Sequence, residues 1–259
     1  MPEPIEYRRS CEAMGTRFEV ILRGADEQHL EAVAVAVCEE IQRLDAALSR
    51  FNPTSEITRL NRLASAQAVR VDRELFALLV RCEQARELTE GYFDVTALSG
   101  GNGLMLDAER QTVRFTRPQT AIDLGGVGKG YALDCGRGIL ERFGILTGLL
   151  QGGTSSVLAL GTDEWPIDIR YPLQSEAAPI ARVRLANCGF SCSAIRHPMQ
   201  THSDLVNPLS SEALRGDDAC VVMAANAMAA EIFSTALLAM GKAKALRYLA
   251  QHTDLKLTV

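Results

Sequence analysis

The chain has 259 residues, of which 47% are hydrophobic and 23% charged, and its formal net charge is −5 at pH 7. This length and composition predict a globular protein with a full hydrophobic core and exclude an intrinsically disordered chain. The negative net charge and the lack of a clustered Lys/Arg run argue against a nucleic-acid-binding surface.

Seven cysteines are scattered along the chain without a C-x-x-C pair or a zinc-site spacing. We interpret them as reduced, buried thiols. Residues 1–11 contain no apolar segment typical of a signal peptide, and no apolar run is long enough to cross a bilayer. The sequence as it stands predicts a cytoplasmic protein, and a periplasmic location is the alternative if an upstream segment has been removed.

The first third of the chain is predicted to form one strand and three helices. Apolar side chains alternate over residues 12–22, which predicts a strand with one buried face. Apolar residues recur at helical spacing over residues 27–48 and again over residues 72–90. Between these two helices, Ser55 follows an Asn-Pro turn and is placed to cap a short helix.

The rest of the chain mixes short strands with helices. Residues 196–215 are polar and broken by Pro, and we interpret them as an irregular loop. The other predicted elements are strands at 113–116, 148–161 (two strands with a glycine turn), 165–170, 181–185, 188–193 and 218–224, and helices at 131–143, 227–240 and 243–252. This mixed order predicts an α+β fold with mostly antiparallel sheets flanked by helices. We expect one domain over residues 1–259, or two closely packed α+β halves.

The most informative stretch is residues 121–134, where a short apolar strand leads into four glycines, one lysine and then a helix. Glycines let the backbone approach a ligand closely, and the amides at a helix start attract negative charge. The stretch is not a Walker loop, because Lys129 is followed by Gly130, and its glycine spacing is not G-x-G-x-x-G. The residues alone leave two interpretations open, a phosphate-binding loop and a structural strand-to-helix turn.

Several other positions also have both a structural and a functional interpretation. We expect Phe51 to be a core aromatic, and a stacking surface for a ligand is the alternative. Asp94 and Thr96, at the end of a predicted helix, fit either capping or ligand contacts. His197 and His202 lie in the polar loop, where we expect solvated histidines.

Six short motifs are spread in order along most of the chain. They are Met14-Gly15-Thr16, Ser49 to Asn61, Gly91 to Thr96, Asp123 to Asp134, Gly152-Gly153, and Ala230 to Ala236. Together they resemble the motifs of the ApbE family, the FAD:protein FMN transferases. The resemblance implies an ApbE-like fold of the T-fold type, with mixed, mostly antiparallel sheets flanked by helices.

The resemblance also implies an activity. Members of the family bind FAD and Mg²⁺, cleave the pyrophosphate of FAD, and transfer FMN to a Thr or Ser hydroxyl of an acceptor flavoprotein subunit with release of AMP. Such a reaction needs an apolar wall for the flavin, donors for phosphate, oxygen ligands for a hard cation, and a base for the incoming hydroxyl.

Residue roles follow from the same resemblance. The implied metal ligands are the Gly126 carbonyl with Glu231, Ser234 and Thr235, and residues spaced i, i+3 and i+4 share one helix face. The structural alternative for Glu231 is an exposed helix carboxylate. The implied base is Asp204 or His202. The implied FAD contacts are Met14, Phe51, Tyr92, Phe93, Asp94, Asp123, Lys129 and Leu205. These roles require the glycine-lysine stretch and the helix of Glu231 to lie side by side.

Five positions depart from the family pattern, one of them Ser211, which stands where the segment of Asp204 has a glycine in the family. Glu231 stands where the family has Asp, and Asp204 stands where it has the histidine often proposed as the base. Phe51 replaces a common tyrosine, and Gly128 replaces Ala. The alternative to a transferase is therefore a flavin-binding protein or a FAD pyrophosphatase that has lost the transfer step, and a scaffold that has lost the ligand altogether is a third hypothesis.

Overall fold

The computed structural model describes residues 4–170, 178–195 and 205–253, and its main feature is a six-stranded sheet of order β1-β2-β6-β7-β10-β13. Every neighbouring pair in this sheet is antiparallel. The strands are β1 (Ile5–Ala13), β2 (Thr16–Gly24), β6 (Thr147–Gly152), β7 (Ser156–Leu160), β10 (Gly189–Ala194) and β13 (Ala219–Ala224). The predicted α+β class with mostly antiparallel sheets is confirmed.

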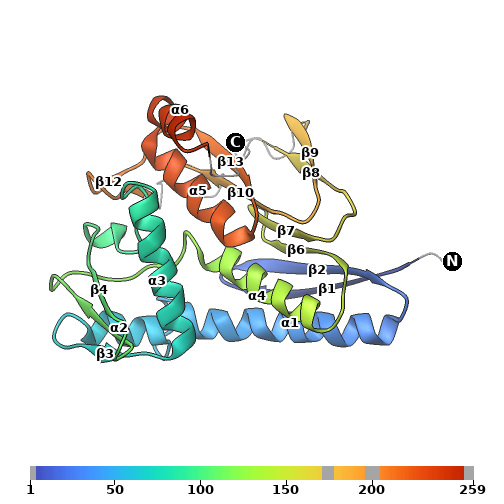
Figure 1. Ribbon diagram of the computed structural model, residues 1–259, viewed down its shortest axis with the longest axis horizontal. Coiled ribbons are helices and arrows are strands. Elements are labelled where there is room, and N and C mark those ends of the chain that lie inside the picture. The colour runs from blue at the N-terminus through green and yellow to red at the C-terminus, as the bar shows by residue number, and fades with distance from the viewer. Residues whose placement is uncertain (1–3, 171–177, 196–204, 254–259) are drawn as a thin grey trace.

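Three helices cover one face of this sheet, as Figure 1 shows. They are α1 (Glu27–Leu48), α4 (Gly128–Arg142) and α5 (Ala227–Met240), each close to its predicted range. The other face carries the hairpin of β8 (Trp165–Ile169) and β9 (Ala181–Leu185). Successive residues of β2 point to opposite faces, so Val20 and Leu22 enter the core under the helices, whereas Ile21 packs with Trp165.

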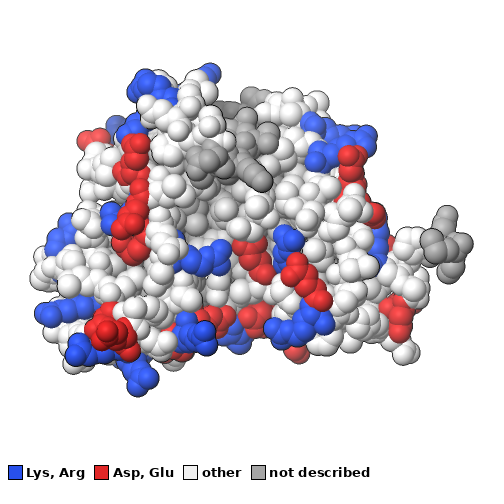
Figure 2. Space-filling view, viewed as in Figure 1, with Lys and Arg blue, Asp and Glu red and all other residues white. Residues whose placement is uncertain are grey.

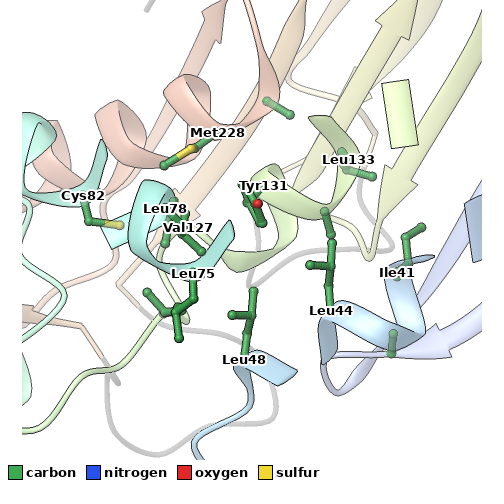
Figure 3. Packing of buried hydrophobic residues seen from close by; sticks show 14 of the residues in the cluster. Ile41, Leu44, Leu48, Leu75, Leu78, Cys82, Val127, Tyr131, Leu133 and Met228 are labelled. Carbon is green, nitrogen blue, oxygen red and sulfur yellow. The ribbon is translucent and has the colours of Figure 1, made fainter. Parts of the chain in front are cut away.

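The main core continues from the sheet into a second group of elements. Leu75 and Leu78 of α3 (Arg73–Leu88) point toward Leu48 and Tyr131 in the region drawn in Figure 3, and all four belong to one buried cluster. The remaining elements are α2 (Glu56–Leu63), the small sheet of β3 (Val69–Arg70), β5 (Thr112–Phe115) and β4 (Leu104–Asp107), the 3₁₀ turn η1 (Ala97–Ser99), the hairpin of β11 (Val206–Asn207) and β12 (Glu212–Ala213), and α6 (Lys242–Gln251). One continuous core therefore holds α3 against the helices on the sheet.

The predicted strand at residues 12–22 is in fact a hairpin. Ala13 pairs with Thr16, so Met14 and Gly15 form a two-residue turn, and both have positive φ (51° and 69°). Positive φ at both positions is the geometry of a type I′ turn, whose twist matches that of the flanking strands. β1 was not predicted because it is an edge strand with mostly exposed, charged side chains, and so it lacks the alternation of a half-buried strand.

The predicted strand before the glycines is also wrong. Residues 121–124 lie in no strand or helix and join no sheet. The Ile122 amide donates to the Asn61 side chain (2.7 Å) and the Asp123 amide donates to the Val95 carbonyl (2.7 Å). The backbone hydrogen bonds of this segment are thus supplied by loops and side chains, which periodicity cannot reveal.

The surface and the thiols agree with the composition. On the face shown in Figure 2, Lys and Arg side chains are interspersed with Asp and Glu. All seven cysteines are free thiols, of which Cys38 and Cys82 are buried and the others partly buried. Burial raises the pKa of the Cys82 thiol to about 12. Among the described residues, no helix is both long and apolar enough to span a bilayer.

Candidate functional site

The first turn of α4 and the middle of α5 meet at a buried carboxylate. Glu231 on α5 is only 4% exposed, so its interpretation as an exposed helix carboxylate is wrong. Its Oε1 atom accepts from Lys129 Nζ (2.8 Å) and Ser156 Oγ (2.6 Å), and its Oε2 atom accepts from the Gly130 amide (2.7 Å). The glycine-lysine stretch and the helix of Glu231 therefore lie side by side, as the sequence interpretation requires.

A second carboxylate ties the start of α5 to α4. Asp134 on α4 accepts hydrogen bonds from the backbone amides of Ala227 (2.9 Å) and Met228 (3.0 Å), the first residues of α5. Burial raises the pKa of the Asp134 carboxyl, and the two amides oppose that shift because they stabilise the carboxylate. Asp134 thus anchors α5 on α4 one helical turn beyond Lys129 and Gly130.

We expect Asp134→Ala to lower the free energy of unfolding by about 2 kcal/mol, because two amides at the start of α5 lose their partner in a largely buried place. Urea denaturation measures this change. Asp26→Ala is the matched control, since Asp26 caps α1 through the amides of Gln28 and His29 at an exposed position. We expect a loss of about 1 kcal/mol there. An equal or smaller loss for Asp134→Ala would contradict the anchoring role.

A cluster of hydroxyl groups lies one helical turn along α5 from Glu231, and Ser234 Oγ donates to the Glu231 backbone carbonyl (3.1 Å). Ser234 Oγ lies 2.8 Å from Ser193 Oγ and 3.0 Å from Ser191 Oγ, and Thr235 Oγ1 lies 3.3 Å from Ser193 Oγ. Gly126 adjoins this group, because a Cβ built on it would lie 3.8 Å from Thr235 Oγ1. Carboxylate, hydroxyl and carbonyl oxygens are the ligands that Mg²⁺ prefers, so the donor types present here fit that ion.

A pocket of about 240 Å³ opens beside the start of α4. Four of the predicted FAD contacts line it, namely Met14, Phe51, Asp123 and Lys129. They come from the β1–β2 turn, the segment after α1, the segment 121–124 and the first turn of α4. The structure therefore brings together residues that are far apart in the sequence.

Phe51 is not the core aromatic that we expected. It is 81% exposed, and the guanidinium of Arg50 lies 4.6 Å from the centre of its ring. The turn that carries it is held by Asn52, whose Oδ1 accepts from the Thr54 amide (3.0 Å), and by Ser55, whose Oγ donates to the Ser49 carbonyl (2.6 Å). A large aromatic side chain held in water beside a pocket favours the stacking interpretation.

Asp123 and Arg50 form an ion pair in the pocket wall, which Asp45 and Lys129 also line. Arg50 Nε lies 3.4 Å from Asp123 Oδ2, and Asp123 Oδ1 accepts from the Gly125 amide (2.9 Å). Asn61 fixes this segment from behind, since its side chain bonds both the amide and the carbonyl of Ile122. Arg50 and Asn61 were not singled out from the sequence, although both lie inside the Ser49 to Asn61 motif.

Tyr92, Phe93 and Asp94 lie outside the lining of this pocket. Phe93 is 3% exposed and lies behind the glycine loop, where a Cβ on Gly126 would be 3.6 Å from its ring. The ring of Tyr92 lies 4.5 Å from Lys244 Nζ. Phe93 therefore supports the loop from inside, and Tyr92 faces α6.

Asp94 acts as a loop cap in the structure. Its Oδ1 atom accepts from the amide and the hydroxyl of Thr96 (both 2.7 Å), and its Oδ2 atom accepts from the Asn102 amide (2.5 Å). Leu205 lies apart from the pocket lining, and its carbonyl accepts from the Leu214 amide (2.8 Å). The two candidate bases, Asp204 and His202, lie outside the described residues.

Ser156 and Gly130 are site residues that the sequence interpretation missed. Ser156 is fully buried and follows the Gly152-Gly153 turn, which packs on the lysine, since a Cβ on Gly152 would lie 3.5 Å from Lys129 Cβ. The signal available in the sequence was the pair of serines after that turn. Nothing local marks either residue as a partner of Glu231, because the contact spans two distant segments.

Comparison with known protein families decides where this chain belongs. The model of the ApbE family matches residues 14–100 and 97–259. The chain belongs to the ApbE family. The motif resemblance noted in the sequence is thereby confirmed.

Curated relatives and solved structures agree with this family. The chain is 22% identical over 260 residues to a FAD:protein FMN transferase of Klebsiella pneumoniae, covering 88% of this chain and 81% of the relative. It is 23% identical over 284 residues to one of Haemophilus influenzae, covering 92% and 81%. It superposes on the ApbE protein of Thermotoga maritima with a TM-score of 0.87 at 21% identity, covering 98% and 93% of the two chains. For the apo form of the Pseudomonas stutzeri flavinyl transferase ApbE, the TM-score is 0.84 at 19% identity, with 99% and 91% covered. The expected ApbE-like fold is confirmed.

Proposed function

We propose that this protein is a FAD:protein FMN transferase, which cleaves the pyrophosphate of FAD and joins FMN to a Thr or Ser hydroxyl of an acceptor flavoprotein subunit with release of AMP. The observation that carries the proposal is the placement of Lys129 between the pocket of Phe51 and the buried carboxylate of Glu231. A cation for phosphate, an aromatic surface and an oxygen-lined site thus adjoin one another. The proposal is consistent with the names of the relatives, which are FAD:protein FMN transferases.

The pocket residues suit the flavin and the diphosphate. Phe51 and Met14 offer an aromatic and a soft apolar surface for the isoalloxazine ring. Lys129 provides an ammonium for a phosphate oxygen, and Arg50, which also lines the pocket, offers a second cation. Asp123 is placed to accept a hydrogen bond from a polar edge of the nucleotide.

Glu231, Ser234, Thr235 and the Gly126 carbonyl are the residues that would hold Mg²⁺. When bound there, Mg²⁺ would neutralise charge on the diphosphate and on the leaving AMP. Ser191 and Ser193 would orient the two hydroxyls of α5, because Ser234 and Thr235 already lie within hydrogen-bond distance of them. We assign activation of the acceptor hydroxyl to Asp204 or His202, which lie outside the described residues.

A second candidate function is FAD hydrolysis or flavin binding without transfer. It is favoured by Asp204, which replaces the histidine of the family pattern, and by Glu231, whose two oxygens already accept from three donors. A protein that binds FAD without activating an acceptor hydroxyl would keep the pocket but lose the transfer step.

An AMP-release assay separates these functions. The purified protein is incubated with FAD and MgCl₂, with and without an acceptor flavoprotein subunit, and AMP is quantified by chromatography. The transferase proposal predicts AMP only when the acceptor is present, together with a gain in acceptor mass equal to FMN less water. AMP without acceptor would instead indicate a pyrophosphatase. Quenching of flavin fluorescence with no AMP in either reaction would indicate a protein that binds FAD but does not cleave it.

Phe51→Ala tests the stacking role. We expect FAD affinity to fall about tenfold, equivalent to about 1.4 kcal/mol, because the aromatic face is lost. Stability should stay within about 0.5 kcal/mol, since the exposed ring supports no core. Flavin fluorescence titration and urea denaturation measure the two quantities. Phe143→Ala removes another exposed aromatic, 49% exposed after α4, and should leave FAD affinity unchanged. If the two variants changed FAD affinity equally, the flavin would not stack on Phe51.

A further inference from the structure

The ion pair of Lys129 and Glu231 joins two residues to which the proposed function gives separate tasks. Lys129 is the proposed phosphate ligand and Glu231 the proposed metal ligand, yet in the structure Lys129 Nζ lies 2.8 Å from Glu231 Oε1. The ammonium therefore occupies a place on the carboxylate that a divalent cation would need. Oε1 also accepts a hydrogen bond from Ser156 Oγ, and Oε2 accepts one from the Gly130 amide.

The two partners differ in their freedom to move. The Glu231 side chain is 5% exposed and held by the Ser156 hydroxyl and the Gly130 amide, whereas the Lys129 side chain is 23% exposed and borders the pocket. A lysine ammonium is a compact charge on a flexible four-carbon stem. If the pair opens, Lys129 is the partner that turns away, and the pocket is the open space beside it.

We propose that Lys129 acts as an internal cation that blocks Glu231 in the free protein, and that the diphosphate of the nucleotide draws the ammonium into the pocket and so exposes the carboxylate to a divalent cation. This inference rests on the proposed function. A like-charged ammonium and metal ion repel each other at one carboxylate oxygen, so each excludes the other. Because coupling between two binding sites is reciprocal, the metal strengthens nucleotide binding by the same factor.

Glu231, one methylene longer than the aspartate of the family pattern, is the feature of this chain that suits such a block. The longer side chain carries its oxygens to the Gly130 amide and to Lys129 Nζ in the first turn of α4. Metal binding in the absence of nucleotide is therefore expected to be weak in this protein.

The test is a titration with Mn²⁺, a spin-active substitute for Mg²⁺, in which free Mn²⁺ is measured by electron paramagnetic resonance. Without nucleotide, we expect Lys129→Met to bind Mn²⁺ at least about tenfold more tightly than the wild type. Arg137→Met is the matched control, because it removes the same charge from α4 where Arg137 pairs with Glu141 (2.8 Å). We expect its Mn²⁺ affinity to stay within about twofold of the wild type. Equal affinities of Lys129→Met and the wild type would overturn the inference.

A second titration uses the wild type alone and can therefore still refute the block if Lys129→Met does not fold. FAD should raise the affinity for Mn²⁺ by about tenfold or more, whereas riboflavin, which enters the same pocket without a diphosphate, should leave it unchanged. No effect of FAD, or an equal effect of riboflavin, would refute the block. Solution binding of Mn²⁺ to FAD is subtracted by a titration without protein.

The proposed function can fail separately from this inference. If AMP is released in the acceptor assay while Lys129→Met and the wild type bind Mn²⁺ equally, the transferase stands and the internal block is refuted. If the Mn²⁺ titrations give the expected differences but no AMP forms, the block stands and the transferase proposal fails.

Discussion

Glu231→Ala is expected to lower the free energy of unfolding by about 3 kcal/mol and to abolish Mg²⁺-dependent AMP release. The stability loss follows from removing one partner of a buried ion pair, which leaves Lys129 without its counter-charge and the Ser156 hydroxyl and Gly130 amide without an acceptor. The loss lies at the lower end of the range for buried pairs, because the Lys129 ammonium can still turn toward water. Urea denaturation and the AMP assay measure the two effects.

Glu141→Ala is the matched control for Glu231→Ala. Glu141 pairs with Arg137 at 2.8 Å on the exposed side of α4, with 54% of its own side chain exposed. Surface pairs of this kind contribute little, so we expect a change within about 0.5 kcal/mol and unaltered AMP release. If Glu231→Ala were as stable as Glu141→Ala, the ion pair would not hold α4 and α5 together. If Glu231→Ala released AMP at the wild-type rate, Glu231 would not be a metal ligand of the reaction.

Gly130→Ala is expected to have the largest effect of any single methyl group added to α4. A Cβ at this position would lie 2.5 Å from the Ala227 carbonyl oxygen and 2.9 Å from Met228 Cα, which are backbone atoms of α5 and cannot rotate away. The helices must separate, at a cost of about 3 kcal/mol. Separation also pulls the Gly130 amide and Lys129 from Glu231, so FAD-dependent AMP release should fall with stability.

Gly138→Ala adds the same methyl group to the same helix without a clash. Gly138 lies in α4, and a Cβ there would meet nothing within 4 Å. Alanine is favoured over glycine in a helix, so we expect the free energy of unfolding, measured by urea denaturation, to rise by about 0.4 to 1 kcal/mol. If both variants had a lower free energy of unfolding than the wild type, α4 would tolerate no change of helical propensity. If both had a higher one, the tight crossing at Gly130 would be disproved.

The helices show how much of the fold the local pattern of apolar residues can predict. The 3.6-residue apolar repeat of α1 and the predominance of small and apolar residues in α5 predicted both ranges to the residue, because one buried face or nearly full burial leaves its pattern in the sequence. β1 left no such period, since an edge strand exposes most of its side chains. Residues 121–124 misled the prediction because apolar side chains reveal burial but not the partner of each amide.

The candidate site divides in the same way. The motifs alone were enough to name Met14, Phe51, Asp123 and Lys129, and the structure places all four around one pocket. Their interpretation still needed the fold. Phe51 was expected in the core because most aromatics are buried, and only the tertiary structure shows it in water.

The amino-acid sequence by itself determined the helices, most of the strands, the family and the residue types that the chemistry requires, because these depend on short-range periodicity and on motifs that are contiguous in the chain. The tertiary structure alone decided which of those residues meet. Glu231 and Gly130 are 101 positions apart, and their hydrogen bond depends on the close crossing of α4 and α5 and on the anchor at Asp134. Such contacts follow from packing between distant segments, which leaves no local pattern to read.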